Sequence, residues 1–441
     1  MRSKVRALVR FALIFFSLQM PALAAASYTI TDLGLLPGFR TVDASEAYAI
    51  NAQGQVAGMT RGTNTGLFPQ NPTVWSTTTP NATDGSLLDL ATGDYAPPRQ
   101  SVAKGINDYG QVVGESTFGS GAFLWTPNSP NGQTGTIVDL GHLAGGSDIG
   151  STATDINSRG QVVGGSTAET PAYLRAYLWS PTTPNATTGS MVDLGMLPES
   201  SYSYANGINS SGQVVGQSSS ENAHRAFLWT PDTPNGETGA MVDLGSLGGA
   251  YDRSVGVDIN DRGQVAGDAF SPEGLPVKAF LWSPDAVNGD VGSMIDLGQL
   301  GAAGSTFAYG MNSFGQVVGA SDVGVPTNAA YHGFLWTPTA PNAMTGEMID
   351  LNTLLAPEDR AEWTIASARG INDRGQIAAI AYHHPVGSNM SPVTRGVLLT
   401  PAVPEPATWW LVAVVISAAT VNRLAMYGVR GEDRGSRRET N

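Results

Sequence analysis

The chain of 441 residues contains no cysteine, and only 14% of its residues are charged. Without cysteine, disulfides and thiolate metal sites are excluded, so packing and strand closure must stabilise the fold. None of the five histidines has a metal-binding spacing. These histidines are His142, His224, His332, His383 and His384. The sequence also lacks a Gly-x-Ser-x-Gly elbow and a phosphate-binding glycine loop, so we expect no catalytic residue, metal or cofactor.

The charge balance excludes two classes of partner. Residues 25–421 contain 14 basic and 34 acidic residues, a net charge near −20. Such a body repels nucleic acid and anionic lipid. The acidic residues are scattered along the chain, which indicates a solubilising surface. The low charge and the 54 glycines are typical of an all-β protein rich in tight turns.

The N-terminus predicts export. Four basic residues precede the apolar residues 11–16, and the sequence Ala-Leu-Ala follows at residues 22–24. This order is that of a signal peptide over residues 1–24, and cleavage after Ala24 or Ala26 fits equally well. The apolar stretch is too short for a membrane-spanning helix.

A nine-residue phrase, first written Ile-Asn-Ala-Gln-Gly-Gln-Val-Ala-Gly at residues 50–58, recurs seven times. Its asparagines are Asn51, Asn107, Asn157, Asn209, Asn260, Asn312 and Asn372. A period near fifty residues indicates stacked or radial units that cannot bury a core alone. The repeated residues are therefore expected to serve the fold, and the protein-specific residues to lie between the copies.

Two further repeated segments accompany each copy of the motif within this chain and complete a set of four short strands. Strand a ends at the Asn, and Asn-x-x-Gly forms a type I turn into strand b. Strand c ends at a tryptophan, replaced by Leu399 in the seventh copy, and strand d ends in Asp-Leu-Gly in most copies. The tryptophans are Trp75, Trp125, Trp179, Trp229, Trp282 and Trp336. The aspartates are Asp32, Asp89, Asp139, Asp193, Asp243, Asp296 and Asp350.

Each repeated residue has a structural interpretation. Burying about 150–250 Å² per tryptophan gives on the order of 4–6 kcal/mol, so we expect packing between repeats rather than a row for carbohydrate stacking. The aspartates are expected to accept backbone N–H groups at strand ends. Residues 258–263 mimic a calcium loop, but Arg262 occupies a ligand position, which favours a plain turn.

Four antiparallel strands at this period predict an all-β, seven-bladed propeller over residues 28–400, with a strand order that resembles the kelch-type blade. The region opens with a lone strand d at residues 28–34 and ends without one. We expect this first strand to complete the last blade, which removes free sheet edges. An open β-solenoid would need capping repeats and has no use for a split blade.

The tripeptide before the tryptophan carries a family resemblance. It reads Gly-Ala-Phe at residues 121–123, Arg-Ala-Phe at 225–227, Lys-Ala-Phe at 278–280 and His-Gly-Phe at 332–334. Together with the other phrases, it resembles the bacterial extracellular HAF-repeat proteins, named for His-Ala-Phe, over residues 28–400. The resemblance implies an exported repeat protein, in a family without a defined biochemical activity.

The C-terminal segment, residues 403–441, carries a second resemblance. Pro404, Glu405 and Pro406 precede the apolar residues 407–421 and a basic tail. This order resembles the PEP-CTERM sorting signal, which implies processing by an exosortase-type membrane protease and release to the cell surface or extracellular matrix. Fifteen helical residues span about 22 Å, short of the ~30 Å hydrocarbon core, so the apolar helix would be a transient inner-membrane anchor. An uncleaved tail anchor is the alternative.

The loops predict where binding occurs. In a propeller, the a–b turns and c–d loops share one face, here called the turn face, and their sequences nearly repeat. The b–c and d–a loops form the opposite face, here called the loop face, and they vary, as recognition loops on rigid scaffolds do. The candidate binding residues are Tyr202, Tyr204, Tyr251, Arg253, Trp363, His383 and His384.

These features favour a non-enzymatic surface or matrix protein that binds an extracellular glycan or protein through the loop face. The alternative is a polysaccharide hydrolase or lyase on a propeller scaffold. Hydrolysis requires two carboxyl groups about 5–9 Å apart. Glu358, Asp359 and Glu362 cluster in one loop, but we interpret them as a solvated insertion.

Overall fold

A computed structural model describes residues 27–402 except 63–69, 78, 92–99, 117–120, 144–149, 169–173, 222, 325–330 and 385–390. The predicted signal peptide and the predicted sorting segment, with its apolar residues 407–421, lie outside the described residues. No helix within the described part of the chain has the length and apolar character needed to cross a membrane.

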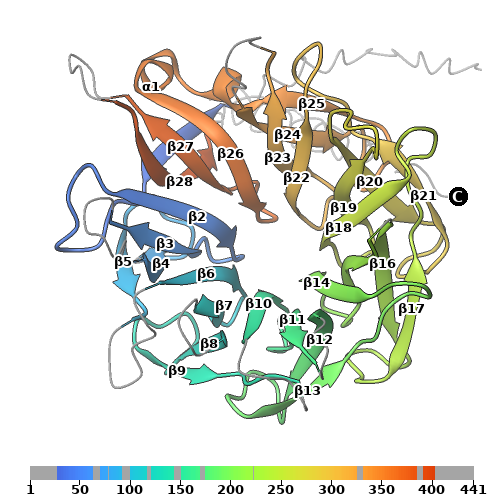
Figure 1. Cartoon of the computed structure of the whole chain (residues 1–441). Helices are drawn as coiled ribbons and strands as arrows, with labels where there is room; N and C mark the ends of the chain where they lie inside the picture. The colour runs from blue at the N-terminus through green and yellow to red at the C-terminus, as the bar shows by residue number, and fades with distance from the viewer. Residues whose placement is uncertain are drawn as a thin grey trace, which may run out of the picture. The chain divides into compact units, whose positions relative to one another are not determined.

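The unit Tyr28–Pro401 is an all-β propeller of seven four-stranded antiparallel blades, which confirms the predicted fold (Figure 1). Blade 1 comprises β2 (Ala44–Ile50), β3 (Val56–Arg61), β4 (Gln70–Thr77) and β5 (Gly85–Asp89). Blade 2 comprises β6 (Ser101–Ile106), β7 (Val112–Ser116), β8 (Gly121–Pro127) and β9 (Gly135–Asp139). Blade 3 comprises β10 (Ser151–Ile156), β11 (Val162–Thr167), β12 (Leu174–Pro181) and β13 (Gly189–Asp193).

The next three blades repeat this order of strands a to d. Blade 4 comprises β14 (Tyr202–Ile208), β15 (Val214–Ser219), β16 (His224–Pro231) and β17 (Gly239–Asp243). Blade 5 comprises β18 (Arg253–Ile259), β19 (Val265–Phe270), β20 (Lys278–Pro284) and β21 (Gly292–Asp296). Blade 6 comprises β22 (Thr306–Met311), β23 (Val317–Asp322), β24 (Tyr331–Pro338) and β25 (Gly346–Asp350). A 3-10 helix, η1 (Leu351–Leu354), and a short helix, α1 (Pro357–Glu362), follow it.

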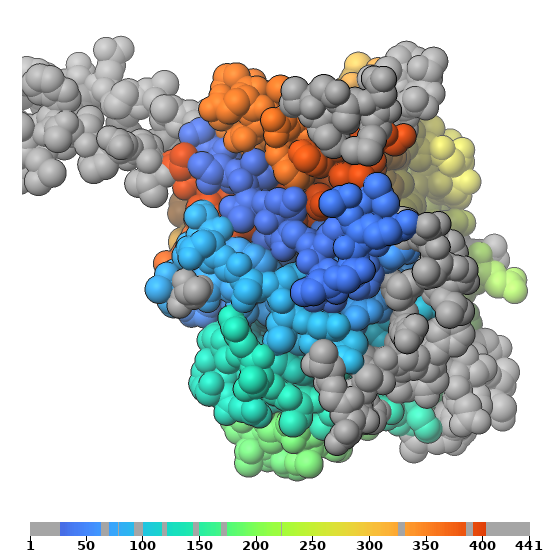
Figure 2. Space-filling model, turned by 90° about the vertical axis from the view of Figure 1, so that its left-hand side faces the viewer, coloured from blue at the N-terminus to red at the C-terminus, as the bar shows by residue number. Residues whose placement is uncertain are grey.

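Blade 7 is assembled from both ends of the propeller, as the split repeat predicts. Its strands are β26 (Trp363–Ile371), β27 (Ile377–His383), β28 (Val393–Pro401) and β1 (Tyr28–Asp32). Strand β1 pairs antiparallel with β28 over five residues, from Tyr28 opposite Pro401 to Asp32 opposite Val397. Figure 2 shows the blue N-terminal residues of the propeller packed directly against red residues near position 400. The ring is therefore closed by hydrogen-bonded strands.

The hydrophobic core is divided among the junctions between blades. One cluster joins Val113 and Leu124 of blade 2 to Val162, Tyr177 and Trp179 of blade 3, and the other junctions are similar. The six repeated tryptophans are only 2–5% exposed, which confirms their packing role. A side chain at Gly135 would lie 2.7 Å from the ring of Trp125, so the glycine that opens strand d is required by the tryptophan.

The aspartates at the ends of strand d also have the predicted role. Each accepts a hydrogen bond of 2.7–2.9 Å from the backbone N–H two residues later, as Asp139 does from Gly141. This side-chain turn satisfies a backbone donor where the sheet ends. The repeated aspartates thus belong to the frame, by which we mean the repeated residues that hold the blades in place.

Candidate functional site

The repeated asparagine closes its own turn. In blade 1, the backbone N–H of Gly54 donates to the carbonyl of Asn51 at 3.0 Å. The side-chain Oδ1 of Asn51 accepts from the backbone N–H groups of Gln53 (3.0 Å) and Gln55 (2.9 Å). Gly54 has φ +80°, which favours glycine at the fourth position of the turn. The motif is therefore a self-contained a–b turn.

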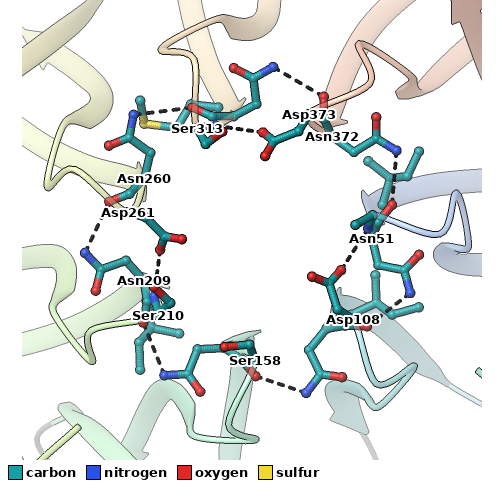
Figure 3. Close-up of a pocket in the computed structure, with 18 of the residues that line it drawn as sticks. Asn51, Asp108, Ser158, Asn209, Ser210, Asn260, Asp261, Ser313, Asn372 and Asp373 are labelled. Carbon is teal, nitrogen blue, oxygen red and sulfur yellow. Dashed lines mark hydrogen bonds between the residues drawn. The ribbon is translucent and has the colours of Figure 1, made fainter. Parts of the chain in front are cut away.

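The same asparagines form a closed ring around the propeller axis. The Nδ2 of each donates to the backbone carbonyl of the asparagine in the next blade, at 3.0–3.3 Å, and Asn372 completes the circle by donating to Asn51 (Figure 3). All seven side chains are buried, with 3–6% exposure. The turn face is thus held together by seven hydrogen bonds that asparagine side-chain amides form between blades.

The repeated glutamine adds a second connection. The Nε2 of Gln161 in blade 3 donates to Ser180 Oγ (3.2 Å) and to the carbonyl of Asn235 in blade 4 (3.1 Å). Asn235 lies in the c–d loop with φ +62°, a conformation that asparagine tolerates better than most residues. Five junctions share this bond between glutamine and the next c–d loop. The polar groups of the turn face are therefore largely used between blades.

The ring encloses a cavity of about 380 Å³, here called the mouth, lined by the seven Ile-Asn-x or Met-Asn-x triplets. In three blades the third residue is an aspartate, Asp108, Asp261 or Asp373. Each accepts the backbone N–H of the corresponding residue in the preceding blade, at 2.8–3.0 Å. Within the described residues, no three acidic or histidine side chains are grouped to hold a metal ion.

A second cavity of about 190 Å³, here called the waist, adjoins the mouth and shares Ile50, Ile106, Met311 and Ile371 with it. It is lined by the residue three positions before each repeated asparagine. These residues are Tyr48, Lys104, Thr154, Asn206, Val257, Tyr309 and Arg369. The seven positions carry six residue types, whereas the position directly before them is alanine in six blades and glycine in one.

A β-bulge places these residues in the waist. In all seven blades the pairing register of strands a and b shifts at this position, so that one residue of strand a has no partner. In blade 1, for example, Ala47 and Ala49 pair with β3, and Tyr48 between them does not. Bulges redirect a side chain out of the alternating pattern of a strand. The sequence predicts protein-specific residues in the loops between the copies, and this position within strand a was not predicted.

The charged groups of the waist have few partners. Lys104 Nζ lies 3.0 Å from Glu115 Oε1. The guanidinium of Arg369 lies 4.0 Å from the ring centroid of Tyr309, and its Nε donates to Ser367 Oγ at 3.2 Å. Burial raises the pKa of the Tyr309 hydroxyl, which therefore stays protonated and able to donate near neutral pH.

Two aspartates line the opposite side of the waist, one position after the bulge. Asp155 accepts the N–H groups of Ile156 (2.8 Å) and Ile208 (3.0 Å), and Asp258 accepts those of Ile259 (2.8 Å) and Met311 (2.7 Å). Burial raises the pKa of Asp155 to about 6. Burial, followed by the charge of Asp155, raises the pKa of Asp258 to about 7. Asp258 therefore keeps a substantial protonated fraction near neutral pH, whereas Asp155 is mostly ionised there.

The predicted binding residues fall into two groups at the loop-face ends of their blades. Trp363 and His383 stack in blade 7, with ring centroids 4.3 Å apart and an interplanar angle of 25°. Beside them, His384 Nε2 lies 3.2 Å from Thr364 Oγ1. Glu362 Oε2 lies 4.0 Å from His383 Nε2. This group combines two aromatic rings with hydrogen-bonding and acidic groups.

The second group belongs to blades 4 and 5, and the side chains of Tyr204 and Tyr251 contact other residues of the protein. The hydroxyl of Tyr204 lies 2.8 Å from Thr152 Oγ1, and its ring packs over Gly165, so this side chain fills the junction between blades 3 and 4. The hydroxyl of Tyr251 donates to the Pro276 carbonyl at 3.0 Å. Tyr202 and Arg253 begin strands β14 and β18. The structure does not bring all seven predicted residues into one site.

The acidic cluster of the alternative function lies on helix α1. Glu358 and Glu362 are exposed there, as a solvated insertion would be. Burial, followed by the charges of Glu358 and Glu362, raises the pKa of Asp359. Asp359 is only slightly buried among them, so the cluster differs from the enclosed carboxyl pair that glycoside hydrolysis uses.

Comparisons with known proteins add the following. A family model described as a protein of unknown function (DUF3466) matches residues 238–400. No curated protein sequence matches the chain. An α-L-arabinofuranosidase from Podospora anserina, solved with cellotriose, is 9% identical, with 86% of this chain and 98% of that chain covered and a TM-score of 0.30. A β-1,2-mannobiose phosphorylase from Listeria innocua is 12% identical, with 85% of this chain and 96% of that chain covered and a TM-score of 0.33. Similarities at this level carry no argument about function.

Proposed function

We propose that this protein is exported and acts without catalysis at the cell surface or in the extracellular matrix, where its loop face binds a glycan or a protein. The observation that carries the proposal is the contrast between the two faces. On the turn face the repeated amide side chains bond to neighbouring blades. The stacked pair of Trp363 and His383 on the loop face belongs to no repeated contact.

The blade 7 group has the chemistry that recognition of a glycan or a peptide requires. Aromatic side chains provide large contact areas with little loss of conformational entropy. Trp363 and His383 are held by their mutual stacking, and Tyr382 beside them is 44% exposed. Glu362 and His384 supply hydrogen-bonding groups at the edge. These residues come from β26, β27 and the end of α1, so the scaffold holds them in place.

A binding screen of the mature protein on a glycan array, followed by assay of any captured glycan for new reducing ends, tests this function. We expect retention without turnover. Trp363→Ala should weaken binding about tenfold, as loss of an anchoring aromatic does, and Phe314→Ala, an exposed aromatic on the turn face, should not. Release of reducing ends would instead support a hydrolase, and unsaturated ends a lyase.

The proposed location depends on the two terminal segments. We propose that an exosortase-type membrane protease removes the segment beyond Pro404, Glu405 and Pro406, which releases the chain from a transient inner-membrane anchor. Replacing these three residues with alanine should leave the full-length chain in the membrane fraction of a host with such a protease. Intact-mass measurement of surface material decides the matter, since retained Arg437 and Arg438 would indicate an uncleaved tail anchor.

A further inference from the structure

The residues of the waist are not required by the packing of the propeller. Four positions before each repeated asparagine, strand a carries a buried alanine, or glycine at position 256, which fits between neighbouring strands. The next residue is the bulged one, and its side chain enters the waist in every blade. Packing therefore restricts the position of the alanine or glycine to small residues, but it sets no common requirement for the bulged residue that follows. Its diversity needs another explanation.

The waist has two chemically different halves. Consecutive blades 6, 7, 1 and 2 contribute Tyr309, Arg369, Tyr48 and Lys104, two cations and two phenols. Blades 3, 4 and 5 contribute Thr154, Asn206 and Val257, together with Asp155 and Asp258. Lys104 is already paired with Glu115, and the Tyr48 hydroxyl donates to Glu46, so Arg369 is the group of the first half that can bind an anion. The second half offers mostly hydrogen-bond acceptors. A complementary ligand needs an anionic end and several hydrogen-bond donors.

Several of these groups have hydrogen-bonding capacity left. Among the described residues, the terminal nitrogens of Arg369 have no acceptor and form no salt bridge, and the Tyr309 hydroxyl has no hydrogen-bond partner. Asn206 uses its Nδ2 to donate to Gly256 at 2.7 Å, and no described residue donates to its Oδ1. A guanidinium inside a narrow cavity binds carboxylates strongly, because the charged hydrogen bonds form away from bulk water.

We propose that the waist binds a small carboxylic acid that carries hydroxyl groups, of the size of a single sugar acid. Arg369 holds the carboxylate, and Tyr309, Asn206 and Thr154 bond to the hydroxyl groups. The waist, at about 190 Å³, is the smaller of the two cavities, and the proposed ligand lies within it alone. The ligand enters through the mouth, whose open centre Figure 3 shows.

The two aspartates are compatible with this ligand. Each carboxyl oxygen already accepts a backbone N–H, which offsets its negative charge. Their raised pKa values reduce the charge further near neutral pH. The remaining lone pairs of the carboxyl oxygens are acceptors for ligand hydroxyl groups. The site is distinct from the loop face, so it stands or fails independently of the proposed function.

Calorimetric titration of the mature protein at pH 6.5 tests the proposal, with glucuronate as the probe and glucose, acetate, phosphate and glutamate as comparisons. We expect glucuronate to bind at least tenfold more tightly than any of the others. Arg369→Gln should weaken glucuronate binding 10- to 100-fold, the range for a charged hydrogen bond, and Tyr309→Phe about fivefold. Arg159→Gln, which removes an exposed arginine from an a–b turn, is the matched control and should change nothing.

Several results would overturn the proposal. Glucuronate that fails to bind at 10 mM, or that binds Arg369→Gln and the native protein equally, excludes the waist as its site. Acetate or phosphate binding as tightly as glucuronate removes the role of the hydroxyl groups, and tighter binding of glutamate replaces the hydroxy acid with a zwitterion. If Arg369→Gln fails to fold, as shown by its thermal transition, Tyr309→Phe decides on the same criteria. Trp363→Ala should leave this titration unchanged.

Discussion

The mouth and the waist of the channel are built from the same seven strands, only three residues apart, yet they use their polar side chains in opposite ways. At the mouth, the side-chain Nδ2 of every repeated asparagine is bonded to a neighbouring blade. At the waist, the bulged position carries six residue types. Thr154 and Asn206 donate to the next blade, whereas Arg369 and Tyr309 retain hydrogen-bonding capacity. Repetition marks groups whose partners are other blades, whereas the diverse position includes groups, such as the Arg369 guanidinium, that retain capacity for a partner outside the repeat.

The comparison also separates two sources of stability. The frame combines buried tryptophans with a ring of buried amides, so that each junction has both apolar area and satisfied polar groups. The bulged residues add less: among them, Thr154 and Asn206 each donate to a backbone carbonyl of the next blade, that of Ala205 and that of Gly256. Changes in the frame should therefore lower stability, whereas changes at the waist and on the loop face should alter binding. The predictions below test this division, beginning with the largest expected effect.

Removing residues 28–34 should have the largest effect. The deletion takes β1 from blade 7, and with it Tyr28, which is buried in the blade 7 cluster, and Leu33, which packs against blade 1. We expect a loss on the order of 5 kcal/mol or more, from the apolar area alone, together with an exposed sheet edge. Denaturant unfolding measures the loss. Thr29→Ala, at an exposed position of the same strand, is the control, and an unchanged deletion variant would show that the ring needs no closing strand.

Trp229→Ala should cost on the order of 3–5 kcal/mol, as loss of a large core aromatic does. Trp229 is 3% exposed and packs with Val163 and Leu178 of the preceding blade. The alanine variant leaves a cavity at the junction of blades 3 and 4. Equilibrium unfolding in urea gives the difference. Trp229→Leu is the informative control, because blade 7 has Leu399 at the equivalent position, and it should recover a large part of the loss.

Asn209→Ala should cost on the order of 2–4 kcal/mol. Its Nδ2 donates to Gln213 and to Asn260 of the next blade, and its Oδ1 accepts from the N–H groups of Ser211 and Gln213. Truncation leaves buried donors and acceptors without partners, which costs more than the bonds themselves contribute. Ser210→Ala, at the exposed neighbouring position, should change the unfolding midpoint little. Equal effects of the two substitutions would mean that the ring is not part of the frame.

The frame was predictable from the sequence because its residues repeat. The period of about fifty residues, the tryptophan at the end of strand c and the unmatched strand at residues 28–34 together predict seven closed blades. The waist was not predictable, because a β-bulge adds one residue to strand a and turns Lys104 or Arg369 toward the channel, where strict alternation does not place them. Three-dimensional pairing registers were needed to identify that position.

The stability of the native protein should fall as the pH rises from about 4 to about 8, because of Asp268. This carboxyl group is buried, accepts the Ala308 N–H at 2.9 Å, and has a pKa raised by burial to about 8. A pKa above the unfolded value of ~4 means that the protonated form stabilises the fold, fully below pH 4, and that this contribution is lost progressively until the folded chain releases its proton near pH 8. Between pH 6 and 9, the free energy of unfolding should fall on the order of 2 kcal/mol less for Asp268→Asn than for the native protein. Parallel pH dependences, measured by urea unfolding, would show that Asp268 is already ionised.

The smallest change in stability is expected for Trp363→Ala, which contrasts with Trp229→Ala. Trp363 is only partly buried, stacks on His383 and packs at the edge of the cluster between blades 6 and 7 rather than inside it. Because its removal exposes the edge of a cluster instead of creating an enclosed cavity, we expect a loss of about 1 kcal/mol. The same urea unfolding experiment measures it beside Trp229→Ala. Equal losses at the two positions would remove the distinction between frame residues and recognition residues, since Trp363 would then be a seventh packing tryptophan. A small loss accompanied by weaker glycan or protein binding would establish that distinction on the loop face as well.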